Sequence, residues 1–264
     1  MKLFGKYCVI LFKSQLQYRA SFLLLSAGQF LMPLTSLAGL YFLFERFGHI
    51  EGWSFYEVAL IFAVIHMTFA LSECLSRGFD MFSTLVVNGE FDRLLVRPRS
   101  TVLQVLGSKF EFTRIGRLLQ SSLVLGWAIS GLSVEWTAWK VVVLVMMIAS
   151  GAVIFTGIFM IMAALSFWTI QGLEVANVFT DGGREMAQYP ISIYQKWITR
   201  FFTFVIPFGC VNYLPLLYIL GRTEDGSEGV SFLYSLAPLA GFVFIVPCLL
   251  VWRFGVRHYR STGS

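Results

Sequence analysis

The side chains that could bind a metal ion or carry out acid–base chemistry are few and scattered in this sequence. The three histidines show no HExxH motif or equivalent spacing. The four cysteines include no CxxC pair, so the sequence indicates neither a zinc site nor a disulfide framework. These residues are His49, His66, His258, Cys8, Cys74, Cys210 and Cys248. We therefore expect no catalytic set, no metal site and no cofactor bound by this chain.

One pair of ionisable residues could act together within an apolar segment. His66 and Glu73 are separated by a spacing that places both on one face of a helix. An ionisable pair inside a membrane is by default a functional hypothesis. Because Glu73 is near the end of the apolar segment, a carboxylate satisfied at the membrane interface is the favoured interpretation.

Nucleotide hydrolysis by the common phosphate-binding loop is excluded. The pattern GxxxxGK[ST], whose backbone and lysine hold the phosphates, does not occur, and the GSK at 107–109 lacks the upstream glycine. If ATP drives this protein, another polypeptide must hydrolyse it.

The segment 80–117 combines apolar and charged residues in a way that is typical of a docking surface. Within NGEFDRLLVRP, an Asn-Gly turn and a proline border a short amphipathic piece. Leucines beside charges of both signs offer a partner apolar anchors and orienting contacts. The residues that we expect to contact it are Gly89, Glu90, Asp92, Arg93, Leu95, Arg97 and Pro98. A loop that packs only on itself is the alternative.

Prolines interrupt the apolar stretch 201–221. Each proline removes a backbone hydrogen bond, so we expect a kink or break there. Such interruptions are tolerated in membranes where they are buried in protein or line a cavity, which makes Pro207, Asn212 and Pro215 a candidate pathway wall. A packing kink without function is an equal alternative.

The composition places these residues in a membrane protein. Of the chain, 57% is hydrophobic and 13% charged, whereas soluble domains are about 25% charged. Continuous apolar runs without alternation favour helices over a barrel. We therefore predict an all-α polytopic membrane protein with about six transmembrane helices. The uncharged stretches are 20–44, 58–72 (extended towards Gly78), 118–134, 141–173 (one helix running into the interface), 201–221 and 229–252.

The basic residues give the orientation. With the N-terminus inside, segments 1–19, 77–117, 184–200 and 253–260 hold four, seven, three and three Lys or Arg, and the outer segments hold three. The positive-inside rule then places both termini in the cytoplasm. The net charge of +5 is explained by anionic lipid and needs no nucleic acid.

Two segments are predicted to lie along the inner membrane surface. Residues 1–19 form an amphipathic interfacial helix, distinct from the transmembrane domain 20–264, although a solvated basic tail is the alternative. Residues 184–200 follow a break at Gly182-Gly183, turn at Pro190 and form a second short interfacial helix.

Taken with these motifs, the chain resembles the permease subunits of type-2 ABC exporters, over nearly its whole length. It is most similar to a bacterial subfamily of ABC transport system permeases with a Gly-Glu-(Leu/Phe)-Asp-Arg-x-Leu-x-Arg-Pro pattern. That pattern falls on Gly89, Glu90, Phe91, Asp92, Arg93, Leu95, Arg97 and Pro98. A second pattern falls on Tyr189, Pro190, Tyr194, Phe204, Pro207, Tyr213 and Pro215.

The resemblance implies a half-transporter in the bacterial plasma (inner) membrane. Two permease chains, identical or related, would pair, and two ATP-binding subunits carrying ATP and Mg²⁺ would dock on the loop 80–117. Some type-2 exporters have a re-entrant outer hairpin. The outer loop after 201–221 is short, so such a hairpin requires that residues after Val211 form it.

The expected function is export of an amphiphilic or hydrophobic solute, driven by the separate ATPase. A secondary transporter or channel is the first alternative, and it would predict inverted repeats and functional charges near mid-membrane. An intramembrane enzyme acting on lipid is the second, and it would need a reactive group at the interface.

Overall fold

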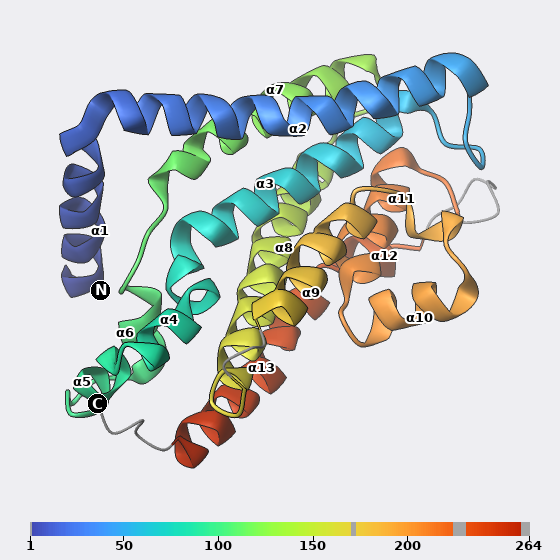
Figure 1. Ribbon diagram of the computed structural model, residues 1–264. Helices are drawn as coiled ribbons and strands as arrows, with labels where there is room; N and C mark the ends of the chain where they lie inside the picture. The colour runs from blue at the N-terminus through green and yellow to red at the C-terminus, as the bar shows by residue number, and fades with distance from the viewer. Residues whose placement is uncertain (1, 170–172, 224–230, 260–264) are drawn as a thin grey trace.

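The computed structural model describes residues 2–169, 173–223 and 231–259, and all regular elements within them are helical (Figure 1). The long helices are α2 (Arg19–Phe47), α3 (Phe55–Asp80), α7 (Ile115–Gly131), α8 (Ala138–Leu165) and α13 (Leu239–His258). The shorter helices are α1 (Lys2–Gln15), α4 (Phe82–Val87), α5 (Glu90–Leu95), α6 (Thr101–Leu106), α9 (Leu173–Ala187), α10 (Lys196–Phe204), α11 (Leu214–Leu220) and α12 (Leu233–Leu236).

Helix α3 forms the centre of the bundle. It packs against α2, α7, α8 and α9, and α8 packs in turn against α13. Consecutive residues 58–65 of α3 are buried on every side, as expected of a helix that is apolar all round. Two apolar cores result. One joins α2, α3, α7, α8 and α11, and the other joins α3, α4, α5, α8 and α13.

Several of these helices are long and apolar enough to cross a membrane. Four candidate spans occur among the described residues, at Cys8–Phe47, Phe55–Val87, Ala138–Leu165 and Leu233–His258. Helix α7 has 17 residues, about 26 Å, slightly less than the hydrocarbon thickness of about 30 Å. The prediction of an all-α polytopic membrane protein is confirmed.

Glycines allow close approach where helices cross. A Cβ added at Gly116 of α7 would lie 1.9 Å from the carbonyl oxygen of Ser26 in α2. One at Gly78 of α3 would lie equally close, 1.9 Å, to the carbonyl oxygen of Val105 in α6. Small residues at helix contacts are typical of membrane bundles, because they let backbones pack closely.

Two predicted helix boundaries are wrong. Helix α8 does not run to residue 173: it ends at Leu165, and a turn brings the Phe167 ring inward against Trp252. The glycines 182–183 do not interrupt α9, which continues to Ala187. The chain turns instead before Pro190, because proline lacks the N–H that a helix needs.

The largest correction concerns the segment 184–200. The sequence predicts it on the inner side of the membrane, opposite the loop between α2 and α3, whereas the structure brings the two together. Trp53 in that loop donates from Nε1 to Ser192 Oγ at 3.2 Å. Arg222 Nη2 donates to Glu57 Oε2, in the first turn of α3, at 3.3 Å. The segment 192–222, which contains the stretch 201–221, therefore begins and ends beside the start of α3. In Figure 1, α10, α11 and α12 gather there, away from α4–α6 and the end of α13.

The break predicted at Pro207 is confirmed. Helix α10 ends at Phe204, and Gly209–Tyr213 form a π-helical turn that leads directly into α11. The two halves meet at 81°. Pro215 does not break the chain a second time. It occupies the first turn of α11, where its missing N–H has no cost.

Candidate functional site

The predicted docking residues lie on α5 and the turns beside it, at the end of the bundle where α13 ends (Figure 1). Gly89 precedes α5 in the left-handed conformation with φ of 66°, which glycine adopts without strain. Arg93 is 74% exposed and Glu90 44% exposed, with 3.9 Å between their charged groups. Leu95, Arg97 and Pro98 are also exposed. The structure thus brings the polar residues of the motif together on an accessible surface.

Asp92 is the inward-facing carboxylate of the motif. Its side chain lies beside Tyr259, which follows α13. Burial, together with the nearby charge of this carboxylate, raises the pKa of Tyr259 to about 12. The phenol therefore keeps its proton at any physiological pH, and it remains available to donate to the carboxylate.

An aromatic cluster holds this segment to the bundle. We use that name for Phe79, Phe82, Phe91, Phe167, Trp252 and Tyr259. The Trp252 ring lies 5.1 Å from Phe79 and 4.9 Å from Phe82, between centroids. Its Nε1 donates to Thr101 Oγ1 of α6 at 3.1 Å. The cluster therefore joins α3, α4, α5, α6 and α13 into one unit.

A group of charges is buried between α3 and α7. Arg117 Nη1 donates to Glu73 Oε2 at 2.7 Å, and Arg114 lies 3.0 Å from the other carboxylate oxygen. Arg117 also donates to Gln29 Oε1 of α2 at 2.8 Å. Arg77 pairs with Asp80 and approaches Glu111 at 3.6 Å. We call Glu73, Arg77, Arg114 and Arg117 the buried charge cluster.

Glu73 is therefore satisfied by arginines rather than by His66. The His66 ring is 2% exposed, and its Nε2 lies 3.2 Å from Gln188 Oε1, beyond the end of α9. The structure gives each member of the hypothetical His66–Glu73 pair its own partner. It does not bring the two together as a reactive pair.

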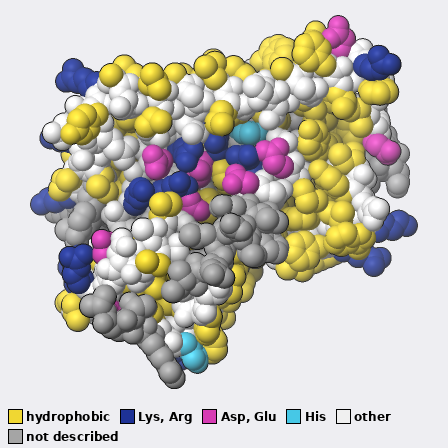
Figure 2. Space-filling view, viewed as in Figure 1, with side chains coloured by type: hydrophobic (Ala, Val, Ile, Leu, Met, Phe, Trp, Pro, Cys, Tyr) yellow, Lys and Arg dark blue, Asp and Glu magenta, His cyan; other side chains and the backbone are white. Residues whose placement is uncertain are grey.

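Helix α9 adds further charged residues beside the buried charge cluster. Arg184 pairs with Asp181 at 3.4 Å and Glu185 at 2.6 Å, and its guanidinium lies 4.9 Å from the Phe69 ring centroid. Figure 2 shows basic and acidic side chains gathered in the middle of the molecule, with hydrophobic surface around them. Asp181 and Glu185 are 55% and 48% exposed. We call Asp181, Arg184 and Glu185 the charged face, and its carboxylates are exposed on the single chain.

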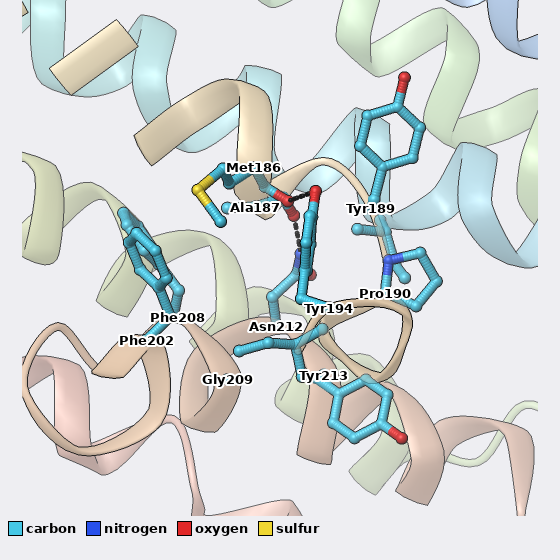
Figure 3. A pocket seen from close by; sticks show the side chains of 12 residues that line it. Met186, Ala187, Tyr189, Pro190, Tyr194, Phe202, Phe208, Gly209, Asn212 and Tyr213 are labelled. Atoms are coloured by element: carbon cyan, nitrogen blue, oxygen red, sulfur yellow. Dashed lines mark hydrogen bonds between the residues drawn. The ribbon is translucent and has the colours of Figure 1, made fainter. Parts of the chain in front are cut away.

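A small cavity lies where α9 meets the hairpin of α10 and α11 (Figure 3). Tyr194 donates from its hydroxyl to the Met186 carbonyl at 3.0 Å, and Asn212 Nδ2 donates to the Ala187 carbonyl at 3.0 Å. Both bonds satisfy carbonyls at the end of α9. The free space is about 20 Å³, enough for about one water molecule.

Of the candidate pathway residues, Asn212 lines this cavity, with its Oδ1 unpartnered among the described residues. Pro207 and Pro215 are buried but do not line it. Tyr189, Pro190 and Tyr213 of the second motif do. A role for these residues in a pathway remains a prediction.

The buried charge cluster was missed from sequence, because Arg114 and Arg117 were assigned to the solvated loop. Two signals could have found it. Glu73 is the one charged residue in the stretch 58–76, and a charge inside the membrane requires a partner of opposite sign. Arg114 and Arg117 are three residues apart and so share one helix face.

These features define an all-α polytopic membrane protein with a segment projecting from one end and no nucleotide-binding loop in its sequence. A family model described as ABC-2 family transporter protein matches residues 30–263, so the chain belongs to that family. No match was found among curated proteins or among solved structures. The chain is accordingly the transmembrane permease component of an ABC transporter, whose ATP-binding partner is a separate component.

Proposed function

We propose that this permease exports an amphiphilic solute across the bacterial inner membrane. Two permease chains, identical or related, would form the complete pathway. Two ATP-binding subunits, which carry ATP and Mg²⁺, would dock on the loop 80–117 through the motif that begins at Gly89. Both termini would be cytoplasmic.

The observation that carries this proposal is the attachment of the docking segment. The Glu90 and Arg93 side chains are exposed, whereas Phe91 between them is fully buried in the aromatic cluster. A segment fixed to α3 and α13 in this way would convert movement of a docked subunit into tilting of those helices. A loop that packed only on itself would transmit no such movement.

The proposed topology has six crossings, formed by α2, α3, α7, α8, α9 and α13. Helices α10 and α11 form a hairpin that enters from the outside and returns, because both its ends lie beside the start of α3. Lys196 and Arg200 are then outside. Helix α9 then forms the fifth crossing, which the sequence alone assigned to the stretch 201–221.

The charged face favours an amphiphilic solute over a purely hydrophobic one. Exposed carboxylates such as Asp181 and Glu185 are costly in hydrocarbon and are therefore expected to face protein or water. We place this face at the contact with the second permease, where it would line an aqueous part of the pathway.

Reconstitution with the ATP-binding subunit tests the proposal. Export should depend on that subunit and vanish when its catalytic carboxylate is replaced. Arg93→Glu should leave insertion intact but uncouple hydrolysis from export, and Asp92→Arg should do the same. If these variants export normally, the docking assignment is wrong.

A charge-swapped variant separates docking from local structure. Glu90→Arg/Arg93→Glu restores the pair within α5 but inverts the surface that the ATP-binding subunit meets. We expect no rescue. Recovery of export in this variant would show that the pair is only structural.

The buried charge cluster supports one alternative, a secondary transporter or channel. Buried ionisable residues in spans are typical of ion-coupled pathways. That function predicts transport by the permease alone, driven by an ion gradient and independent of ATP. Transport that persists without the ATP-binding subunit would favour it.

A further inference from the structure

A groove of about 390 Å³ separates the beginning of α6 from the last turns of α13. It is lined by Ser100, Thr101, Val102, Leu249, Trp252, Arg253, Val256 and Arg257. Its floor is fixed, because the Trp252 indole donates to Thr101 across it. The groove includes residues 100–102 of the loop 80–117, but none of the motif residues from Gly89 to Pro98 and none of the candidate pathway residues lines it.

The groove carries two arginines on one wall. Arg253 and Arg257 are one helical turn apart, so both side chains project from the same face of α13. Both are exposed, and no ion pair joins either of them to another described residue. No carboxylate lines the groove. An anionic group would therefore meet two guanidinium donors and no opposing charge.

The opposite wall supplies hydroxyl groups. Thr101 Oγ1 accepts the bond from Trp252, which leaves its own proton free to be donated. Ser100 lines the groove beside it. These groups suit a phosphate, whose oxygens accept several hydrogen bonds at once.

An apolar strip leads along α13 to the arginines. Val243, Val246 and Leu250 are 66%, 54% and 58% exposed, and they follow one another at helical spacing towards Arg253. From Val243 to Arg253 the helix rises about 15 Å, half of the hydrocarbon thickness of about 30 Å. The strip is long enough for an acyl chain of one leaflet.

We propose that this groove binds an anionic phospholipid, with the phosphate on Arg253 and Arg257 and an acyl chain along the strip. Basic pockets between transmembrane helices on the cytoplasmic side are suited to anionic headgroups. The lipid would bridge α6 of the docking segment to α13, beside the Trp252–Thr101 bond. Assignment to the inner leaflet rests on the proposed topology, whereas binding itself does not require the transport function.

Native mass spectrometry of the detergent-purified full chain, without any ATP-binding subunit, tests the proposal. The probes are phosphatidylglycerol and phosphatidylcholine with the same acyl chains. Phosphatidylglycerol should bind more tightly, and Arg253→Gln/Arg257→Gln should weaken its binding about 30-fold, at about one kcal/mol for each basic residue. Equal binding of the two lipids, or unchanged binding by the double variant, would overturn the proposal.

The matched control is Lys6→Gln/Lys13→Gln, which removes two exposed charges from α1. It should bind phosphatidylglycerol as the unmodified chain does, and a loss equal to that of the arginine variant would show non-specific attraction. Millimolar inorganic phosphate should not displace the lipid. Displacement would instead identify a site for free phosphate. Melting temperatures in phosphatidylcholine verify that each variant is folded.

Because no ATP-binding subunit is present, failure of this experiment leaves the proposed export function standing. Conversely, export that proves independent of ATP would leave the lipid site in place.

Discussion

The Arg117 guanidinium donates to the Glu73 carboxylate across 2.7 Å, with both side chains only 7% exposed, and so joins α7 to α3 by a buried ion pair. A buried pair offsets the desolvation of its charges only when further hydrogen bonds satisfy them. Gln29 supplies one such bond to Arg117, and Arg114 supplies a second positive charge to Glu73. Helix α7 and the turn before it therefore meet α3 at the Glu73 carboxylate, and α2 joins them through the bond from Arg117 to Gln29.

Glu73→Gln should destabilise the protein strongly. It leaves Arg114 and Arg117 buried without their countercharge, and removing one partner of a buried pair costs about 3–5 kcal/mol. Unfolding in mixed micelles of increasing denaturing detergent measures the loss. Glu45→Gln, at an exposed position of α2, is the control and should be near neutral. Similar stability of the two variants would show that the cluster is hydrated rather than buried.

Gly116→Ala should loosen the contact between α2 and α7. The added methyl would meet the Ser26 carbonyl at 1.9 Å, and overpacking of this kind costs about 1–3 kcal/mol. Gly126→Ala is a control on the same helix, because no atom lies within 4 Å of its added Cβ. The same unfolding assay should find Gly126→Ala neutral or slightly stabilised, owing to the better helix propensity of alanine. If both variants behave alike, α2 and α7 do not cross at Gly116.

Uncharged length predicted α2, α3, α7, α8 and α13 but not α9, which is the fifth crossing of the proposed topology. Helix α9 carries Asp181, Arg184 and Glu185, which a search for charge-free stretches rejects. These charges are paired with one another, so the helix can lie within the bundle. The stretch 201–221 is uncharged and long, yet it bends by 81° between α10 and the segment Gly209–Leu220. The partners of its two ends, Trp53 and Glu57, are distant in sequence and could not be identified from composition.

The docking motif could be located from sequence, whereas its attachment could not. The turn at Gly89 and the amphipathic α5 follow from local preferences. The contacts of Phe91 depend on Phe167 and Trp252, which are far along the chain. Aromatic residues in a membrane protein are equally consistent with lipid contact, so only the fold distinguishes them.

Phe91→Ala should weaken coupling to the ATP-binding subunit. The Phe91 ring is 0% exposed and lies 4.9 Å from Phe82 and 5.5 Å from Phe167, between centroids. Truncation of a buried phenylalanine lowers stability by about 3–5 kcal/mol. Here it should weaken the packing of α5 against the rest of the aromatic cluster. Reconstituted transporter should still hydrolyse ATP but export less solute for each ATP. Phe42→Ala, at a position 65% exposed on α2 and outside the docking loop, is the control. Unchanged coupling in Phe91→Ala would contradict a transmitting role of the cluster.

Cysteine labelling distinguishes the hairpin from a single crossing at 201–221. In a chain whose four cysteines are replaced by serine, Lys196→Cys and Arg93→Cys place exposed thiols at the start of α10 and in the docking segment. Because Ser192 is bonded to Trp53 beside the start of α3, a hairpin keeps position 196 on the outer side. An impermeant maleimide added to intact cells should therefore label Lys196→Cys and not Arg93→Cys, which should react only after permeabilisation.

Arg46→Cys, exposed at the end of α2, is the positive control for the outer side. Protection of position 196 together with position 93 would restore the crossing at 201–221 and remove α9 from the set of crossings.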